Sequence, residues 1–267
     1  MATGHSSSND NWGQAARFGI FIVGAEVVPE AEWWAMAPDG VSIHAARVSA
    51  PAPWADFKDG KVTLGADLQR GAVQFASMAL SAVVIAHSSS SLMGGPGWDA
   101  AVIDELKRHV HPDTRVTTNG LDCTLALQAC GVKRPLVVFP PWFGQSAIRA
   151  GGTYFSNAGF EDVTTMQVSP GPDWEGVAPG DLYKRFMHIR QDVELLFNQI
   201  VGGCPQGADG VLIAGTGLRS VGVIERLEAA LGRLVVTANQ ASLWRCLGLS
   251  GVETPVSEYG RLLRGAR

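Results

Sequence analysis

Four consecutive serines follow a histidine directly after a short apolar run. The run "AVVIA" (82–86) predicts a strand, and His87 and the serines at 88–91 come next. Hydroxyl and backbone N–H groups at the end of a strand can hold an anion or a carbonyl oxygen. His87 could act as a general acid or base near neutral pH, or be purely structural. The run contains neither a nucleophile elbow nor a phosphate-binding loop, so capping of the next helix is the competing interpretation.

A second loop of small residues follows another apolar run, "GVLIA" (210–214). It begins Gly215-Thr216-Gly217 and precedes a stretch with helical period. The flanking glycines leave backbone N–H groups uncovered, which suits an oxyanion or a carboxylate. A tight turn between a strand and a helix explains the same residues equally well.

An acidic residue ends the first predicted strand. In "VGAEVVPEAEWW" (23–34), Glu26 follows a Gly-Ala turn. A carboxyl group in apolar surroundings has a raised pKa and can exchange a proton near neutral pH. Glu26 is therefore a predicted acid or base, with a position on the surface as the alternative.

Further candidates lie at other predicted strand ends. The sequence "TTNG" (117–120) closes one strand, so Thr118 and Asn119 are expected near the substrate. Trp142 follows another strand and could give a binding cleft an aromatic, apolar wall. His188, inside a predicted helix, is the weakest acid/base candidate.

The elements that position these residues alternate between strand and helix. Strands are predicted at 17–23, 41–48, 82–86, 115–118, 135–139, 163–168, 210–214 and 233–237. Helical periodicity covers 67–80, 97–110, 122–130, 181–201 and 220–231. This alternation indicates an α/β fold with parallel sheets, in which loops at the carboxyl ends of strands form the binding crevice.

A faint internal repeat divides the chain into two doubly wound, pseudo-symmetric halves. "AVVIAHSSSSL" and "GVLIAGTGLRS" share an apolar strand, a loop of small residues and a following helix. We predict a disordered tail at 1–16, a first half of 17–118 plus 238–267, and a second half of 119–237. The active site is expected in the cleft between the halves.

Composition limits the classes of partner. The 267 residues carry a net charge of −4, with 46% hydrophobic and 17% charged residues, and show neither a basic stripe nor an apolar run long enough to span a bilayer. A small-molecule substrate is therefore expected rather than nucleic acid or a membrane, and homo-oligomerisation stays open. The four cysteines form no CxxC pair, which argues against a metal site and is typical of a cytoplasmic protein.

Several phrases together resemble one known superfamily. They are "PDGVSIHAARV" (38–48), "VKRPLVVFPP" (132–141), "AGFEDV" (158–163), "GADGVLIAGTGLRS" (207–220), "VVTANQASLW" (235–244) and "EYGRLLR" (258–264). They resemble the aspartate/glutamate racemase superfamily, in its branch of maleate cis–trans isomerase and arylmalonate decarboxylase. The resemblance extends from about residue 17 to 264. It implies two pseudo-symmetric halves, an active site between them, no metal or organic cofactor, and two reactive thiols, one from each half.

The sequence departs from that pattern at each expected reactive group. The first thiol position falls on Ser88, or on Ser89 if the register shifts by one, and the second falls on Gly215. Glu26 replaces an amide that grips a substrate carboxylate, and Pro141 replaces a tyrosine. A hydroxyl is a weak nucleophile without an activating base, and a carboxylate repels an anionic substrate. The resemblance therefore predicts a family member that lacks both catalytic cysteines.

Three functional hypotheses remain. The first is a cysteine-independent acid/base enzyme, either a lyase such as a hydratase or an isomerase, acting on a small, neutral or weakly polar, cyclic or aromatic substrate. Glu26, His87, Ser88 and Ser89 would be catalytic. The substrate-binding set would be Ser90, Thr118, Asn119, Pro141, Trp142, Gly215, Thr216 and Gly217. The second hypothesis is a non-catalytic binding paralogue, and the third keeps thiol chemistry on a displaced Cys123.

Overall fold

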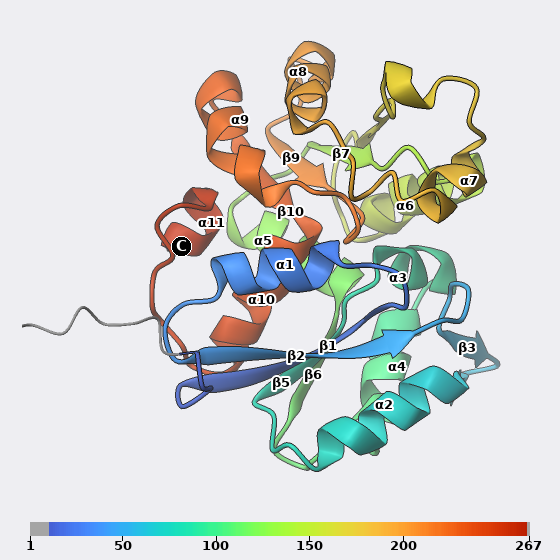
Figure 1. The fold of residues 1–267 in the computed structure, drawn as a ribbon, viewed down its shortest axis with the longest axis vertical. Coiled ribbons are helices and arrows are strands. Elements are labelled where there is room, and N and C mark those ends of the chain that lie inside the picture. The colour runs from blue at the N-terminus through green and yellow to red at the C-terminus, as the bar shows by residue number, and fades with distance from the viewer. Residues whose placement is uncertain (1–10, 266–267) are drawn as a thin grey trace, which may run out of the picture.

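Two parallel four-stranded sheets form the frame of the computed structural model, which describes residues 11–265 (Figure 1). The first sheet has the spatial order β2 (Val41–Val48), β1 (Ala16–Val23), β5 (Ala82–Ile85) and β6 (Arg115–Thr118). The second has the order β8 (Thr164–Gln167), β7 (Pro135–Phe139), β9 (Gly210–Ile213) and β10 (Leu234–Thr237). Counted from the first strand of each sheet, both orders are 2-1-3-4. The predicted pair of pseudo-symmetric α/β halves is thus present.

The predicted strands occur at their expected positions in the two sheets, and four of them are buried along their whole length. Every residue of β5, β7, β9 and β10 is buried. A parallel strand covered by helices on both faces needs such a run. The antiparallel hairpin of β3 (Ala55–Lys58) and β4 (Lys61–Leu64) was not predicted. Most of the predicted tail lies outside the described residues.

Helices connect and cover the strands. They are α1 (Val28–Met36), α2 (Ala66–Ala76), α3 (Ser88–Gly94), α4 (Trp98–Leu106), α5 (Asn119–Ala129), α6 (Gln145–Asn157), α7 (Pro179–Lys184), α8 (Val193–Gly203), α9 (Ile224–Leu231), α10 (Ala238–Leu249) and α11 (Gly260–Arg264), with 3₁₀ turns at Pro172–Trp174 and Val221–Val223. None of the helices within 11–265 is long and apolar enough to cross a membrane.

Helices α1, α5 and α10 join the halves, with α10 packed against both of the others (Figure 1). The largest core cluster draws side chains from both sheets, including Ile20 of β1 and Val138 of β7. Helix α10 contacts β5 and β6 of the first sheet, whereas α11 packs against β10 and α9 of the second. The predicted boundaries of the halves stay a prediction.

The helix predicted over 181–201 is broken. Helix α7 ends at Lys184 and α8 begins only at Val193. Phe186 has a left-handed backbone with φ of +61°, which an α-helix does not accommodate. The Asp192 carboxylate then caps α8 by accepting a hydrogen bond from the Leu195 N–H at 3.0 Å. The break matters because it changes which side chains of this segment reach the cleft.

Candidate active site

Loops from both sheets enclose a cavity of about 220 Å³. They follow β1, β2 and β5 in the first half and β7 and β9 in the second, and α7 adds one side chain. The lining residues are Val23, Glu26, Ala50, Pro51, Ala52, His87, Ser88, Ser89, Trp142, Phe143, Tyr183, Gly215, Thr216 and Gly217. This is the crevice at the carboxyl ends of parallel strands where α/β folds bind ligands.

Glu26 is the one acidic residue among those that line this cavity in the described part of the chain. The Glu26 side chain is almost completely buried, and this burial raises the pKa of its carboxyl group from the ordinary 4.5 to about 7. Thr216 Oγ1 donates to Glu26 Oε2 at 3.4 Å. Tyr183, Thr216 and Arg47 favour the ionised form but offset only part of the effect of burial. The carboxyl group is therefore able to exchange a proton at neutral pH.

Arg47 holds the backbone of Glu26 rather than its carboxyl group. Its guanidinium donates to the Glu26 carbonyl oxygen at 2.7 Å and forms an ion pair with Glu30. The Tyr183 hydroxyl lies beside the Glu26 carboxyl group, but no hydrogen bond of good geometry joins it to a residue in the described range. The Tyr183 hydroxyl keeps its proton at neutral pH, because burial and the nearby Glu26 raise its pKa.

The loop after β9 is built around Glu26. A Cβ atom on Gly217 would lie 2.4 Å from Glu26 Oε1, so a side chain at this position would displace the carboxyl group. A Cβ atom on Gly215 would lie 2.6 Å from Pro140 Cγ, and Gly215 has φ of +89°. A side chain such as a thiol therefore does not fit at position 215 without rearrangement.

A second buried carboxylate, Glu32, fixes this loop. Glu32 Oε1 accepts from the N–H groups of Ser220 at 2.6 Å and Val221 at 3.1 Å. Its Oε2 accepts from Asn239 Nδ2 at 2.7 Å, and the same amide nitrogen donates to the Thr216 carbonyl oxygen at 2.9 Å. Glu32 thus positions the loop that contacts Glu26. Its side chain is not among those lining the cavity.

His87 lines the cavity but is held neutral. Its ring stacks on Trp54 with centroids 4.0 Å apart, and its Nδ1 lies 2.9 Å from Ser90 Oγ. Burial lowers the pKa of His87 to about 3. The imidazole is therefore a neutral hydrogen-bonding group at pH 7, and the proton transfer expected of it near neutral pH is not available.

The serines have different surroundings because they form the first turn of α3 rather than a loop. Ser88 Oγ donates to Asn119 Oδ1 at 2.6 Å and accepts from the Gly215 N–H at 3.2 Å. The half-buried Ser89 lines the cavity, and its side chain forms no hydrogen bond with the residues that the structure describes. Ser90 is fully buried, where its Oγ accepts from the Trp54 N–H at 3.0 Å.

Four of the predicted contact residues do not line the cavity: Ser90, Thr118, Asn119 and Pro141. Ser90 supports His87, and Asn119 supports Ser88. Thr118 turns away and donates to Asp99 Oδ1 at 2.6 Å, while Pro141 borders a separate small hollow. Adjacent side chains at a strand end point in different directions, so position in the sequence alone did not distinguish contact from support.

Tyr183 and Phe143 are lining residues that the sequence analysis missed. The sequence predicts one continuous helix through Tyr183, whereas α7, which carries this residue, ends at Lys184. Its ring stacks on His188, with centroids 4.6 Å apart, and lies 5.8 Å from the Trp142 ring. Together these rings form the aromatic wall predicted from Trp142, with the fully buried His188 behind it.

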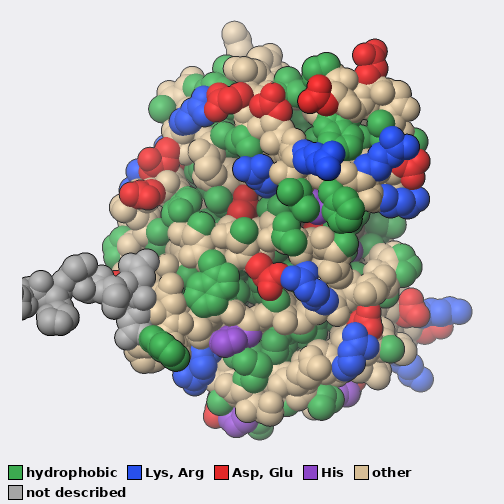
Figure 2. All heavy atoms as spheres, viewed as in Figure 1, with side chains coloured by type: hydrophobic (Ala, Val, Ile, Leu, Met, Phe, Trp, Pro, Cys, Tyr) green, Lys and Arg blue, Asp and Glu red, His purple; other side chains and the backbone are tan. Residues whose placement is uncertain are grey.

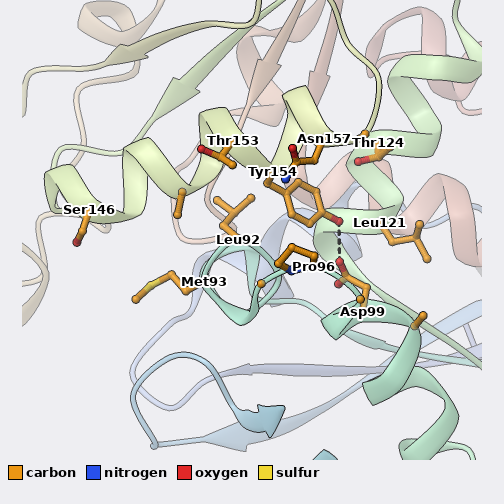
Figure 3. A pocket seen from close by; sticks show the side chains of 15 residues that line it. Leu92, Met93, Pro96, Asp99, Leu121, Thr124, Ser146, Thr153, Tyr154 and Asn157 are labelled. Carbon is orange, nitrogen blue, oxygen red and sulfur yellow. Dashed lines mark hydrogen bonds between the residues drawn. The ribbon is translucent and has the colours of Figure 1, made fainter. Parts of the chain in front are cut away.

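A larger hollow of about 770 Å³ lies elsewhere, among α3, α4, α5 and α6 (Figure 3). Its surface is mainly apolar, and its carboxylate, Asp99, is already hydrogen-bonded. Asp99 Oδ1 accepts from Ser91 and Thr118, and Oδ2 accepts from the Tyr154 hydroxyl at 2.7 Å (Figure 3). This hollow therefore offers space without a free reactive group, and the smaller cavity around Glu26 is the candidate active site.

No cysteine lines the smaller cavity, although all four lie in the described range. Cys123 and Cys246 are buried in the core, and burial raises the pKa of both thiols well above the ordinary value. Cys123 Sγ lies 3.8 Å from Asn119 Oδ1, behind Ser88. The structure therefore gives no support to a thiol displaced to Cys123.

The family model described as arylmalonate decarboxylase matches residues 61–263. The chain belongs to the arylmalonate decarboxylase family. Maleate isomerase from Pseudomonas putida aligns with a TM-score of 0.76 and 20% identity over 94% of this chain and 99% of that one. Unliganded arylmalonate decarboxylase gives a TM-score of 0.72 and 18% identity over 93% and 98%. At these identities the likeness is one of fold.

Another similar structure is the maleate cis–trans isomerase of Nocardia farcinica bound to TRIS, with a TM-score of 0.72 and 17% identity over 93% of this chain and 98% of that one. A search of curated protein sequences found no match. The family and these likenesses confirm the predicted branch of the aspartate/glutamate racemase superfamily. Members of this arylmalonate decarboxylase family are enzymes, and the similar structures belong to an isomerase and a decarboxylase.

Acidic and basic side chains are interspersed on the face shown in Figure 2. That face carries no continuous stripe of one charge. The candidate chemistry therefore lies in the cavity around Glu26 rather than on this face.

Proposed function

We propose that the chain is an acid/base enzyme, either an isomerase or a lyase, that works without a catalytic cysteine. Glu26 would remove a proton from the substrate and return one to it. The proposal rests on one observation: a single carboxyl group, buried against Gly217 and Thr216, lines the cavity between the halves and has a pKa of about 7. At that pKa both protonation states are populated, which suits a general acid or base. The superfamily resemblance implies chemistry without a cofactor.

The neighbouring groups favour a reaction in which one residue both removes and returns a proton. His87 is neutral, with a pKa of about 3, and Tyr183 has a raised pKa. Neither exchanges a proton readily at pH 7, so Glu26 is left to act alone. Its carboxylate would take a proton as an allylic C–H bond breaks and the double bond shifts, and the carboxylic acid, after exchange with solvent, would deliver a proton to the carbon at the other end of the allylic system. We therefore favour a proton-shift isomerisation over a dehydration.

The walls of the cavity suit a small neutral substrate. A volume of about 220 Å³ accommodates a single ring or a short chain, and Trp142 and Phe143 provide apolar contact. An anionic substrate would be repelled by the Glu26 carboxylate, because like charges interact strongly in a cleft of low dielectric constant. Tyr183, Ser89 and the N–H groups of Thr216 and Gly217 remain to hydrogen-bond a carbonyl oxygen.

The test begins with neutral cyclic ketones, alcohols and lactams, screened by thermal shift at pH 7.5. Each compound that binds is then incubated with the enzyme in D₂O, and deuterium incorporation and product formation are followed by NMR and mass spectrometry. We expect incorporation with the natural enzyme and a loss of at least about 100-fold with Glu26→Gln. Glu30→Gln, which alters a partly exposed carboxyl group on α1, is the matched control and should keep the rate.

The second candidate function is a binding protein without catalysis. It is favoured by the absence of cysteine from the lining of the cavity. Binding without conversion or deuterium incorporation, equal in the natural protein and in Glu26→Gln, would support it against the enzyme.

A further inference from the structure

The side-chain amide of Asn119 has only one orientation that satisfies its neighbours. One of its terminal atoms lies 2.8 Å from the Ala238 carbonyl oxygen, which can only accept a hydrogen bond. That atom must therefore be the nitrogen, and it also donates to Ser242 Oγ at 2.9 Å. The amide oxygen is consequently the atom that faces Ser88.

This orientation determines where the Ser88 proton goes. Asn119 Oδ1 can only accept, and it lies 2.6 Å from Ser88 Oγ, so the serine must donate to it. The same Oγ accepts from the Gly215 N–H at 3.2 Å. A hydroxyl has one proton and two lone pairs, so one lone pair remains at a residue that lines the cavity.

The partners of Asn119 are buried and hydrogen-bonded in turn. Ser242 Oγ accepts from Asn119 and donates to Asp122 Oδ2 at 2.7 Å. The side chains of Asn119, Ser242 and Asp122 are fully buried where α5 packs against α10. Rotation of the amide would leave the Ala238 carbonyl and Ser242 without their donor, at a cost typical of unmade buried hydrogen bonds. The Asn119 amide therefore keeps one orientation.

We propose that Ser88 is a fixed hydrogen-bond acceptor in the cavity, and that the substrate presents a hydroxyl or N–H group to it. Asn119 and Gly215 are the positioning residues. The inference rests on the proposed function in taking this cavity as the substrate site. It excludes Ser88 as a nucleophile, because its proton goes to an amide oxygen rather than to a base. It also removes Ser88 from the groups that could hold a carbonyl oxygen, and leaves that task to Tyr183, Ser89 and the N–H groups of Thr216 and Gly217.

The direction of the proton is tested directly by neutron diffraction of the deuterated protein without a ligand. We expect the Ser88 deuteron on the line to Asn119 Oδ1, and two deuterons on Asn119 Nδ2 directed at Ala238 and Ser242. A Ser88 deuteron directed into the cavity would overturn the proposal. This measurement does not depend on activity, so it separates failure of this inference from failure of the proposed function.

The class of ligand is tested with cyclohexanol and cyclohexanone, which have similar shapes but offer a donor or only an acceptor. Binding is measured by calorimetry and ligand-observed NMR. We expect the natural protein to bind the alcohol about tenfold more tightly, and Ser88→Ala to lose that preference, because an unmatched polar group in a buried site costs about that much affinity. Ser146→Ala, which removes a hydroxyl from the separate larger hollow, is the control and should keep the preference.

Three results would contradict this inference. They are equal affinities in the natural protein, an alcohol preference that survives in Ser88→Ala, or binding of neither probe at millimolar concentration. Binding of neither probe would reject the proposed class of ligand. The direction of the Ser88 proton would still be decided by neutron diffraction. In Asn119→Ala the preference should also disappear, since the Ser88 hydroxyl is then free to rotate toward a ketone. If that variant fails to fold, Ser88→Ala still decides the question.

Discussion

Replacing Glu26 with glutamine should raise the free energy of unfolding at pH 8. The same replacement should abolish activity. Burial raises the pKa of this carboxyl group from 4.5 to about 7. Because the pKa is higher in the folded state, the folded protein binds the proton more tightly than the unfolded chain does. The stabilisation from this proton is fully present below pH 4.5 and is lost as the pH rises through 7.

The size of the effect follows from the shift. Each pKa unit corresponds to about 1.4 kcal/mol, so the free energy of unfolding should fall by about 2–3 kcal/mol between pH 5 and pH 8 on account of Glu26 alone. Glu32 and Asp122 also have raised pKa values, of about 7 and about 8, and add to the fall. Their contribution is common to the natural protein and Glu26→Gln, so it cancels in the difference.

The assay is urea unfolding of the natural protein, Glu26→Gln and Glu30→Gln at pH 5 and pH 8. The stability difference between the natural protein and Glu26→Gln should change by about 2–3 kcal/mol in favour of the variant as the pH rises. Glu30→Gln, whose side chain is 34% exposed, should follow the natural protein within about 1 kcal/mol. An identical pH dependence for all three would refute a buried Glu26 with a raised pKa, and with it the basis for its role.

Four other changes test separate parts of the site. Gly217→Ala should lower kcat/KM by about tenfold or more, because its Cβ would displace the Glu26 carboxyl group, whereas Gly222→Ala, with open space around its Cβ, should not. Tyr183→Phe should move the midpoint of the pH–rate profile upward, because the Tyr183 hydroxyl lowers the pKa of Glu26; an unmoved midpoint would contradict that contact. Glu32→Ala should reduce the free energy of unfolding by about 3–5 kcal/mol, measured in urea, because it leaves three buried N–H donors unpaired. Alkylation of accessible thiols should leave turnover unchanged, and its loss would restore the thiol hypothesis.

The positions of the reactive loops could be predicted from the sequence because strand ends are marked by local patterns. Apolar runs followed by small or polar residues located the ends of β1, β5 and β9. Parallel strands bring such ends to one edge of a sheet. This pattern predicts a common cleft for Glu26, Ser88 and Thr216, and all three line the cavity.

The direction in which each side chain points, and how deeply it is buried, could not be predicted from these local patterns. Whether a serine faces the cavity, as Ser89 does, or the core, as Ser90 does, depends on where the first turn of α3 lies against neighbouring residues. Tyr183 lines the cavity from α7, which ends before the left-handed Phe186, whereas helical periodicity predicted one continuous helix. The neutral state of His87 depends on burial against Trp54, whose contact spans 33 positions of the chain.

The sequence by itself therefore determined the two α/β halves and which residue types stand in the loops after the strands, because these follow from short-range pattern and residue identity. Only the tertiary structure decided the raised pKa of Glu26, the close approach of Gly217 to that carboxyl group and the direction of the Ser88 hydrogen bonds. Each of these depends on atoms from distant segments, since desolvation, close contact and hydrogen-bond direction arise only when the two halves are packed together.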